Sequence, residues 1–281
     1  MRIGLLDTWL PRRYLGFWRA YLKELGAELV EPERPFADAL AAEAPDWASL
    51  PLRAVLGRVD ELKGRVDRLL IPDAQLGVDS ERGAGQCPWV RDLAATLRHL
   101  RPSAPPFFVV PTEPTERALA IAAEIGAEVA ESPPRVRLAL ERTRKFLVPP
   151  GPFVLPGASR EPEIGLAAEP YLLEETRLYQ DLLDGLSDLK IGVADRPPAF
   201  LREEGRRMGI RAELPTDLEW AGAAHYLARH HAVQKVLTFI EPECAGFARV
   251  ARWIAEAIPK PLVVVPLGTP ASEVRARLLA V

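Results

Sequence analysis

The chain has 281 residues, a net charge of −3 and a pI of about 5.9. This balance excludes the strong positive field that attracts nucleic acid or an acidic membrane. No apolar run reaches the length of a bilayer span, and the opening MRIGLLDTW turns polar too early for a signal peptide, so we expect a cytoplasmic protein without membrane or nucleic-acid partners.

Amino-acid usage predicts a thermophilic source. Thirty of the 36 basic residues are Arg, and Asn is absent from the chain. Depletion of thermolabile side chains is typical of thermophile proteins. Only two cysteines are present, Cys87 and Cys244, and they lie too far apart in the sequence to suggest a disulfide framework. In a chain with so few cysteines, each one is a stronger candidate for a functional residue than usual.

The first half of the chain alternates short apolar runs with amphipathic segments. Strands are expected at 1–6, just after Gly26, at 67–72 and at 106–111. Helices are expected at 16–26, 51–66, 88–100, 115–126 and 134–147. Pro51 suits the first turn of its helix, and Ser49 or Asp46 can cap it.

Residues 148–187 begin with a run crowded with Pro and Gly, which we expect to be a linker, followed by a connecting helix at 171–186. The alternation then restarts. Strands are expected at 189–195, 210–214, 235–242 and 261–267, and helices at 199–209, 217–231, from Ala245 and at 272–280.

This pattern predicts an α/β protein with two doubly wound, Rossmann-like lobes whose sheets are mainly parallel. The expected divisions are an N-terminal lobe at 1–147, the linker and connecting helix at 148–187, and a C-terminal lobe at 188–281. In such sheets, ligands bind beyond the carboxyl ends of the strands, near helix N-termini.

Three reactive side chains are expected where a helix begins. Cys87 follows the 67–72 strand by a loop, Cys244 follows the 235–242 strand, and Ser49 precedes the 51–66 helix. A thiolate at a helix N-terminus is favoured by the helix dipole. The alternative for each cysteine is a small buried hydrophobe, and for Ser49 it is an N-cap.

Other candidates have only their position to support them. Glu219, Glu241 and Glu243 could act as an acid or base, or could cap a helix. His225 and His230 are five residues apart on one expected helix, which does not give the usual metal-binding face. The sequence contains no GxxxxGK[ST], HExxH or GxSxG, so P-loop, zinc-protease and serine-hydrolase chemistry are disfavoured.

The segments IGLLDTWLPRRYLGFWRAYLKELGAELV, APDWASLPLRAVLGRVDELKGRVDRLLIP and GQCPWV resemble the 2-hydroxyacyl-CoA dehydratase component family, typified by the 2-hydroxyglutaryl-CoA dehydratase D-component. The resemblance continues in LKIGVADRP and EWAGAAHYLARHHAVQKVLTFIEPECAGF. It implies Rossmann-like lobes around a cleft that holds a 4Fe–4S-type cluster on three cysteines. It also implies an acyl-CoA substrate, a second subunit and an ATP-dependent activator.

Carried over residue by residue, two of the three ligand positions fall on Cys87 and Cys244, and the third falls on Ser49. Two further positions depart from the family. Leu6–Asp7 replaces a Pro-Arg pair, and Trp47 replaces a carboxylate. A serine hydroxyl is a far poorer iron ligand than a thiolate, so the resemblance argues more strongly for the fold than for the chemistry.

Three functions remain open at this point. In the first, the chain is a lyase or electron-transfer component, with iron held by Cys87 and Cys244 and the shell completed by Ser49, by water or by a residue of a partner. In the second, no cluster is bound, and the chain is a small-molecule-binding or protein-binding descendant without dehydratase activity. A third and generic option is another two-lobe enzyme that uses Glu219, Glu241 or Glu243.

Overall fold

The computed structural model describes residues 1–73, 92–113, 116–210, 214–241 and 244–280. The chain divides into two compact units, Met1–Pro150 and Gly151–Val281. In the described ranges each unit contains a four-stranded sheet in which all neighbouring strands are parallel. The α/β class with two doubly wound lobes is therefore confirmed. The cleft expected between the lobes stays a prediction.

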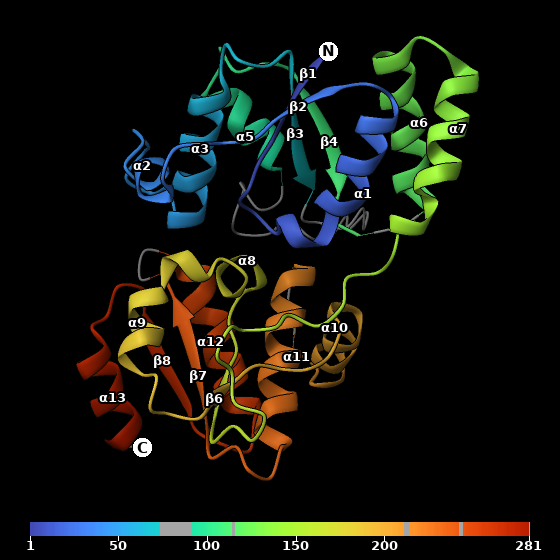
Figure 1. Ribbon diagram of the computed structural model, residues 1–281. Helices are drawn as coiled ribbons and strands as arrows, with labels where there is room; N and C mark the ends of the chain where they lie inside the picture. Colours follow the sequence, from blue (N-terminus) through green and yellow to red (C-terminus); the bar gives the residue numbers. More distant parts are fainter. Residues whose placement is uncertain (74–91, 114–115, 211–213, 242–243, 281) are drawn as a thin grey trace. The chain divides into compact units, whose positions relative to one another are not determined.

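The first unit has the strand order β2-β1-β3-β4 (Figure 1). Its strands are β1 (Arg2–Leu5), β2 (Glu28–Val30), β3 (Arg68–Asp73) and β4 (Phe107–Pro111). Its helices are α1 (Pro11–Glu24), α2 (Phe36–Leu40), α3 (Leu50–Leu62), α5 (Leu93–Leu100), α6 (Glu116–Ala130) and α7 (Pro133–Thr143), followed by the 3₁₀ turn η1 (Arg144–Phe146).

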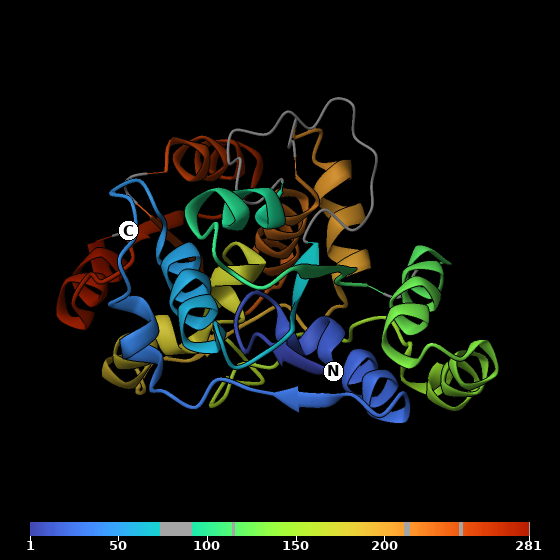
Figure 2. The same cartoon turned by 90° about the horizontal axis from the view of Figure 1, so that it is seen from above.

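Helices cover both faces of the first sheet. α1, α6 and α7 lie on one face, and α3 and α5 on the other (Figure 1). α6 and α7 run side by side, as the view from above also shows (Figure 2). Parallel connections are right-handed, so two connections that run in opposite directions across a sheet place their helices on opposite faces. The connection from β1 to β2 runs in one direction, and the connection from β2 to β3 runs in the other.

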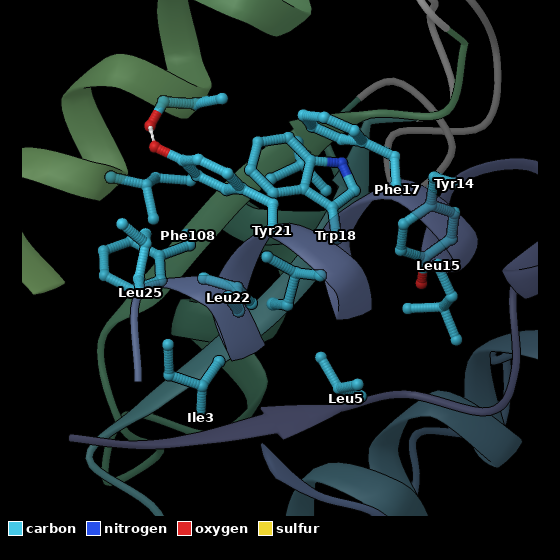
Figure 3. Close-up of a cluster of buried hydrophobic side chains, with 14 of the residues drawn as sticks. Ile3, Leu5, Tyr14, Leu15, Phe17, Trp18, Tyr21, Leu22, Leu25 and Phe108 are labelled. Carbon is cyan, nitrogen blue, oxygen red and sulfur yellow. Dashed lines mark hydrogen bonds between the residues drawn. The ribbon is translucent and has the colours of Figure 1, made fainter. Parts of the chain in front are cut away.

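An aromatic row on α1 fills the core on the side of that helix that faces α6 (Figure 3). Phe17, Trp18 and Tyr21 are all nearly inaccessible to solvent. The rings of Phe17 and Tyr21 stack at 5.6 Å, and the Tyr21 hydroxyl donates a hydrogen bond of 2.6 Å to the carbonyl of Ala122 in α6. Burial raises the pKa of Tyr21 to about 12, so this hydroxyl keeps its proton and its bond to α6.

The second unit has the strand order β6-β5-β7-β8. Its strands are β5 (Ile164–Leu166), β6 (Ile191–Gly192), β7 (Lys235–Ile240) and β8 (Leu262–Pro266). Its helices are α8 (Pro170–Leu173), the 3₁₀ turn η2 (Thr176–Leu178), α9 (Gln180–Gly185), α10 (Pro198–Arg207), α11 (Pro215–Arg229), α12 (Ala245–Ala257) and α13 (Ala271–Ala280).

The expected linker at 148–187 is wrong in part, because it contains a strand of the second sheet. β5 lies in this segment and pairs with both β6 and β7. The strand is only three residues long and contains Gly165, so it gave no apolar run in the sequence. A Cβ at Gly165 would press against Leu227 of α11, which shows why a residue without a side chain stands there.

The single helix expected at 171–186 is also wrong. It is divided into α8, η2 and α9, because the backbone leaves the helical region at Glu175 and Tyr179. The Tyr179 hydroxyl turns back to donate to the carbonyl of Leu173, and the Tyr179 ring packs 4.9 Å from that of Phe239. Burying this ring on β7 stabilises the break.

Two further differences concern element boundaries. The helix expected at 88–100 is described from Leu93, with the Asp92 carboxylate accepting a bond of 2.8 Å from the Ala95 amide. The strand expected at 210–214 falls largely on 211–213, outside the described residues.

Two glycines let α10 and α11 pack backbone to backbone. A Cβ at Gly222 of α11 would overlap the carbonyl oxygen of Leu201, and one at Gly205 of α10 would overlap that of Leu218. Both glycines are buried. This pair of helices forms one tightly joined layer beside β5 and β7. In the described part of the chain, no helix is both long enough and apolar enough to cross a membrane.

Candidate functional site

Both sheets place a topological switch point at the same position in their strand order. In β2-β1-β3-β4 the connections run in opposite directions from β1, and in β6-β5-β7-β8 they do so from β5. The ends of β1 and β3, and of β5 and β7, are therefore where ligands of doubly wound sheets bind.

Ser49 acts as the N-cap of α3, and this bears out the alternative assignment for that residue. Its backbone is extended, and its Oγ accepts a hydrogen bond of 3.4 Å from the Leu52 amide. It is half-buried, and its neighbour Trp47 is exposed. α3 returns the chain from β2 to β3, so its first turn lies on the carboxyl side of the first sheet. The short helix α2 separates Ser49 from the preceding strand, β2.

A buried charge network joins the end of β1 to α3. Arg58, with a side chain only 3% exposed, donates to both carboxylate oxygens of Asp7 at 2.9 and 3.0 Å. It also donates to Glu61 at 2.9 Å and to the carbonyl of Arg34 at 2.7 Å. Burial raises the pKa of Glu61, but bonds from the amides of Arg34 and Glu33, with the charge of Arg58, outweigh it and leave the pKa lowered. Asp7 thus has a structural partner in the fold.

Cys244 lies where the sequence predicts, at the start of α12 just beyond β7. Its amide donates to the carbonyl of Glu241 at 3.0 Å, and its own carbonyl accepts from Phe247 at 3.1 Å. The side chain is half-buried, and within the described residues its sulfur makes no capping bond to the helix. Cys87 lies outside the described residues.

The described residues do not test whether the three expected positions form one site. Ser49 belongs to the first unit and Cys244 to the second, and Cys87 is not described, so the shared site stays a prediction. Within the described ranges, no group of three or more His, Cys, Asp and Glu side chains is placed to hold a metal ion.

The donor set does not fit the three-thiolate cluster that the resemblance implies. The whole chain has two cysteines, and the hydroxyl at the third position accepts a backbone bond at a helix N-terminus. An alkoxide is hard to form near neutral pH and ligates iron poorly. The residues present therefore do not support chemistry through such a cluster.

The expected acid–base candidates have different surroundings. Glu219, in α11, is buried and pairs with Arg202 of α10 at 3.5 Å. Glu241 is buried directly beyond β7. Glu243 lies outside the described residues. The pairing of Glu219 favours a structural role for that residue.

One functional candidate, Glu169, was missed by the sequence reasoning. It follows β5 by three residues, stands as the N-cap residue of α8, and is 1% exposed. Its carboxyl group lies within hydrogen-bond reach of the Asp217 and Thr216 side chains of α11. The sequence does contain the pattern of a short strand that ends near an acidic residue, as IGL at 164–166 followed by AAEP at 167–170. This pattern lies inside the segment assigned to the linker.

The surroundings of Glu169 favour the protonated form of its carboxyl group. Burial, and then the charge of Asp217 beside it, raise the pKa of Glu169 well above its ordinary value. Three helices close around this region. The ring of Phe247 in α12 lies 6.1 Å from that of Tyr171 in α8 and 6.1 Å from that of Trp220 in α11. The second edge thus presents a buried acid beside two α11 carboxylates, Asp217 and Glu219.

No family model and no curated protein matches the chain. Among solved structures, a dinucleotide-forming acetyl-coenzyme A synthetase 1 from Ca. Korarchaeum cryptofilum, in complex with phosphate and ADP, is similar at 15% identity and a TM-score of 0.22. The protein PH0766 from Pyrococcus horikoshii OT3 is similar at 11% identity and a TM-score of 0.23.

Each comparison covers 99% of this chain, which spans 59% and 55% of the length of those two proteins. The apo form of the same synthetase gives 16% identity and a TM-score of 0.22. Likenesses at this level carry no argument about function, which we therefore base on the residues of this chain.

Proposed function

We propose that this chain is a two-lobe α/β protein, similar to the 2-hydroxyacyl-CoA dehydratase components, that binds a small molecule at the carboxyl edges of its sheets and holds no iron–sulfur cluster. The bond from the Leu52 amide to the Ser49 hydroxyl carries the proposal. It gives the residue at the third ligand position a role in helix capping, which serine fills well and cysteine does not.

The position of polar groups supports small-molecule binding. Buried or half-buried polar residues lie near both sheet edges, with Asp7 and Ser49 in the first lobe and Glu169, Glu241 and Cys244 in the second. The resemblance makes an acyl thioester the first ligand to test, and another small molecule or a protein partner are the alternatives. Without a cluster, the proposed function requires neither the second subunit nor the ATP-driven electron donor of the family.

Anaerobic reconstitution with iron and sulfide tests the absence of a cluster. We expect the wild-type protein to stay colourless and free of stoichiometric iron. The variant Ser49→Cys restores the third thiol, and iron uptake by it, lost again in Ser49→Cys/Cys87→Ala, would support a degenerate family site. Visible absorption and stoichiometric iron in the wild type that disappear in Cys87→Ala would overturn the proposal.

Equilibrium binding of acetyl-CoA, measured by calorimetry on the intact chain, tests the ligand class. Saturable binding supports the proposed thioester ligand, and coenzyme A alone serves as the control for recognition of the nucleotide part. If neither compound binds, the thioester class is wrong for this chain, and its ligand belongs to another class of small molecule.

A further inference from the structure

A pocket of about 240 Å³ lies within the first unit, at the carboxyl end of β4. Its described walls come from four stretches of chain: the first half of α1, residues 111–113 at the end of β4, the first turn of α6, and residues 146–148. Ligands of doubly wound sheets bind at this edge. Because one unit supplies every described wall, the pocket forms within the first lobe alone.

The size of the pocket limits what it can hold. Sites for drug-sized ligands have volumes of roughly 300–1,000 Å³. This pocket is smaller, and part of its space is open to solvent. It therefore has no room for a whole nucleotide or a whole coenzyme A, but it has room for one small molecule.

Aromatic rings form the apolar side of the pocket. Phe17 and Trp18 of α1 are 4% and 1% exposed, and their rings meet edge to face at 5.1 Å (Figure 3). Phe146 of η1 also lines the pocket and is 46% exposed, so much of its ring remains accessible. Three aromatic rings around one small pocket favour a ligand with an apolar group.

Two opposite charges line the same pocket. Arg13 of α1 is buried, and Glu113, two residues beyond β4, is half-buried. Each has a partner within the protein. A guanidinium has five N–H donors and a carboxylate accepts at about four positions, so each can keep that partner and also bind a ligand. Thr112 is occupied, because its hydroxyl donates to the Asp73 carbonyl at 3.3 Å.

The position of Arg13 is unfavourable for folding alone. It stands in the first turn of α1, where the helix dipole disfavours a cation, and no acidic residue occupies that turn. Burial of its guanidinium adds a desolvation cost. Departures of this kind from the local rules are typical of functional sites, and a carboxylate placed beside Arg13 would gain from both the cation and the dipole.

The charge pair selects a ligand that carries both signs. A simple carboxylic acid would be attracted by Arg13 and repelled by Glu113, and a simple amine would meet the reverse. A ligand with one carboxylate and one ammonium group is attracted by both side chains. The aromatic rings then require that this ligand also has an apolar part.

We infer that this pocket binds a free α-amino acid with an apolar side chain. The ligand carboxylate accepts hydrogen bonds from the Arg13 guanidinium, and its ammonium group donates to the Glu113 carboxylate. Its side chain packs against the rings of Phe17, Trp18 and Phe146. The inference rests on the proposed small-molecule binding at the sheet edges, and it names the class of molecule that the first lobe takes.

Calorimetry on the intact wild-type protein tests the ligand class. The probes are L-phenylalanine and L-leucine, with 3-phenylpropionate and 2-phenylethylamine as analogues of phenylalanine that each lack one charge. We expect saturable binding of both amino acids. Each analogue should bind at least about tenfold more weakly than phenylalanine, because one charge-assisted contact is lost.

The variant Glu113→Gln separates a binding role from a structural one. It keeps the shape of the side chain and removes its charge, so phenylalanine should bind at least about tenfold more weakly. The affinity for 3-phenylpropionate should not fall, because this compound has no ammonium group to lose its partner. Glu124→Gln, a change at an exposed position of α6, is the matched control and should bind both compounds as the wild type does.

Filling the pocket tests its location. Ala118 lies in the first turn of α6 and lines the pocket, so Ala118→Leu should abolish saturable binding of both amino acids. Ala123→Leu adds the same side chain at an exposed position of α6 and should bind normally. Circular dichroism establishes that both variants are folded.

The outcomes separate this inference from the proposed function. Binding of acetyl-CoA without binding of either amino acid overturns the inference and leaves the small-molecule function standing. The inference is also overturned if 3-phenylpropionate binds the wild type as tightly as phenylalanine does, or if folded Ala118→Leu binds the amino acids normally. If neither acetyl-CoA nor an amino acid binds, the inference and the thioester class fail together.

Discussion

Glu169 reduces the stability of the fold at neutral pH, because the fold holds a carboxyl group in a place where its charge is unfavourable. The pKa of Glu169 is raised in the folded chain, so the folded state binds a proton that the unfolded state releases above its own pKa of about 4.3. Stability is then complete below that pKa and falls as pH rises toward the folded value, by up to about 1.4 kcal/mol per pH unit.

The variant Glu169→Gln should therefore be more stable than the wild type at neutral pH and about equal to it below the unfolded pKa. Denaturant unfolding across this pH range measures the difference, with Glu203→Gln, a change at an exposed position of α10, as the control. A Gln variant that is less stable at neutral pH would show that the carboxylate is charged and satisfied in the fold.

Ser49 and Ser132 are both N-cap residues, but only Ser49 caps with its side chain among the described residues. Ser49→Ala should lower the free energy of unfolding by about 1 kcal/mol, because it leaves the Leu52 amide without its partner. Ser132→Ala should change it by a few tenths at most. Denaturation midpoints of the two variants check this, and equal losses would contradict a capping role for the Ser49 hydroxyl.

At the scale of secondary-structure elements, two glycines of similar helical setting should respond in opposite directions. Gly222→Ala places a methyl group on the Leu201 carbonyl of α10, and overpacking against backbone should cost about 1–3 kcal/mol. Gly16 of α1 is exposed, and a Cβ there meets no atom of the described chain within 4 Å. Gly16→Ala should therefore stabilise by about 0.5–1 kcal/mol. Thermal unfolding distinguishes the two, and a neutral Gly222→Ala would show that α10 and α11 can separate at little cost.

The elements that could be predicted from sequence are those with a long apolar signal. β3, β4, β7 and β8 each stand within one residue or two of an apolar run. For the inner strands β3 and β7 the run reflects burial on both faces of the sheet, which leaves no polar side to break the pattern. Cys244 was placed correctly for the same reason, since the end of β7 and the start of α12 were both clear.

The elements that could not be predicted depend on contacts between distant residues. β5 is recognisable only through its pairing with β6 and β7, and its Gly165 is explained only by Leu227. Glu169 was overlooked with that strand, because its burial beside Asp217 follows from the packing of α8 on α11. For Ser49 the sequence left two roles open, a ligand position implied by the resemblance and a helix N-cap, and the structure shows the capping bond from the Leu52 amide.

At the scale of the whole molecule, each unit has its own sheet and its own buried core. We therefore expect residues 1–150 and 151–281, expressed separately, to fold as two soluble α/β domains. Circular dichroism and cooperative thermal unfolding of each fragment check this. If either fragment lacks a cooperative transition, the two lobes depend on one another for stability.

The strand orders also bear on how the protein forms while it is being synthesised. In each sheet the strand made first, β1 or β5, becomes an inner strand, and every later strand joins an edge that is still open. No strand has to insert between two that are already paired. The first lobe can thus grow outward as the chain leaves the ribosome and be complete when β4 and its two following helices have emerged. The second lobe then repeats the same order of additions, and each new strand pairs with a free edge of the growing sheet.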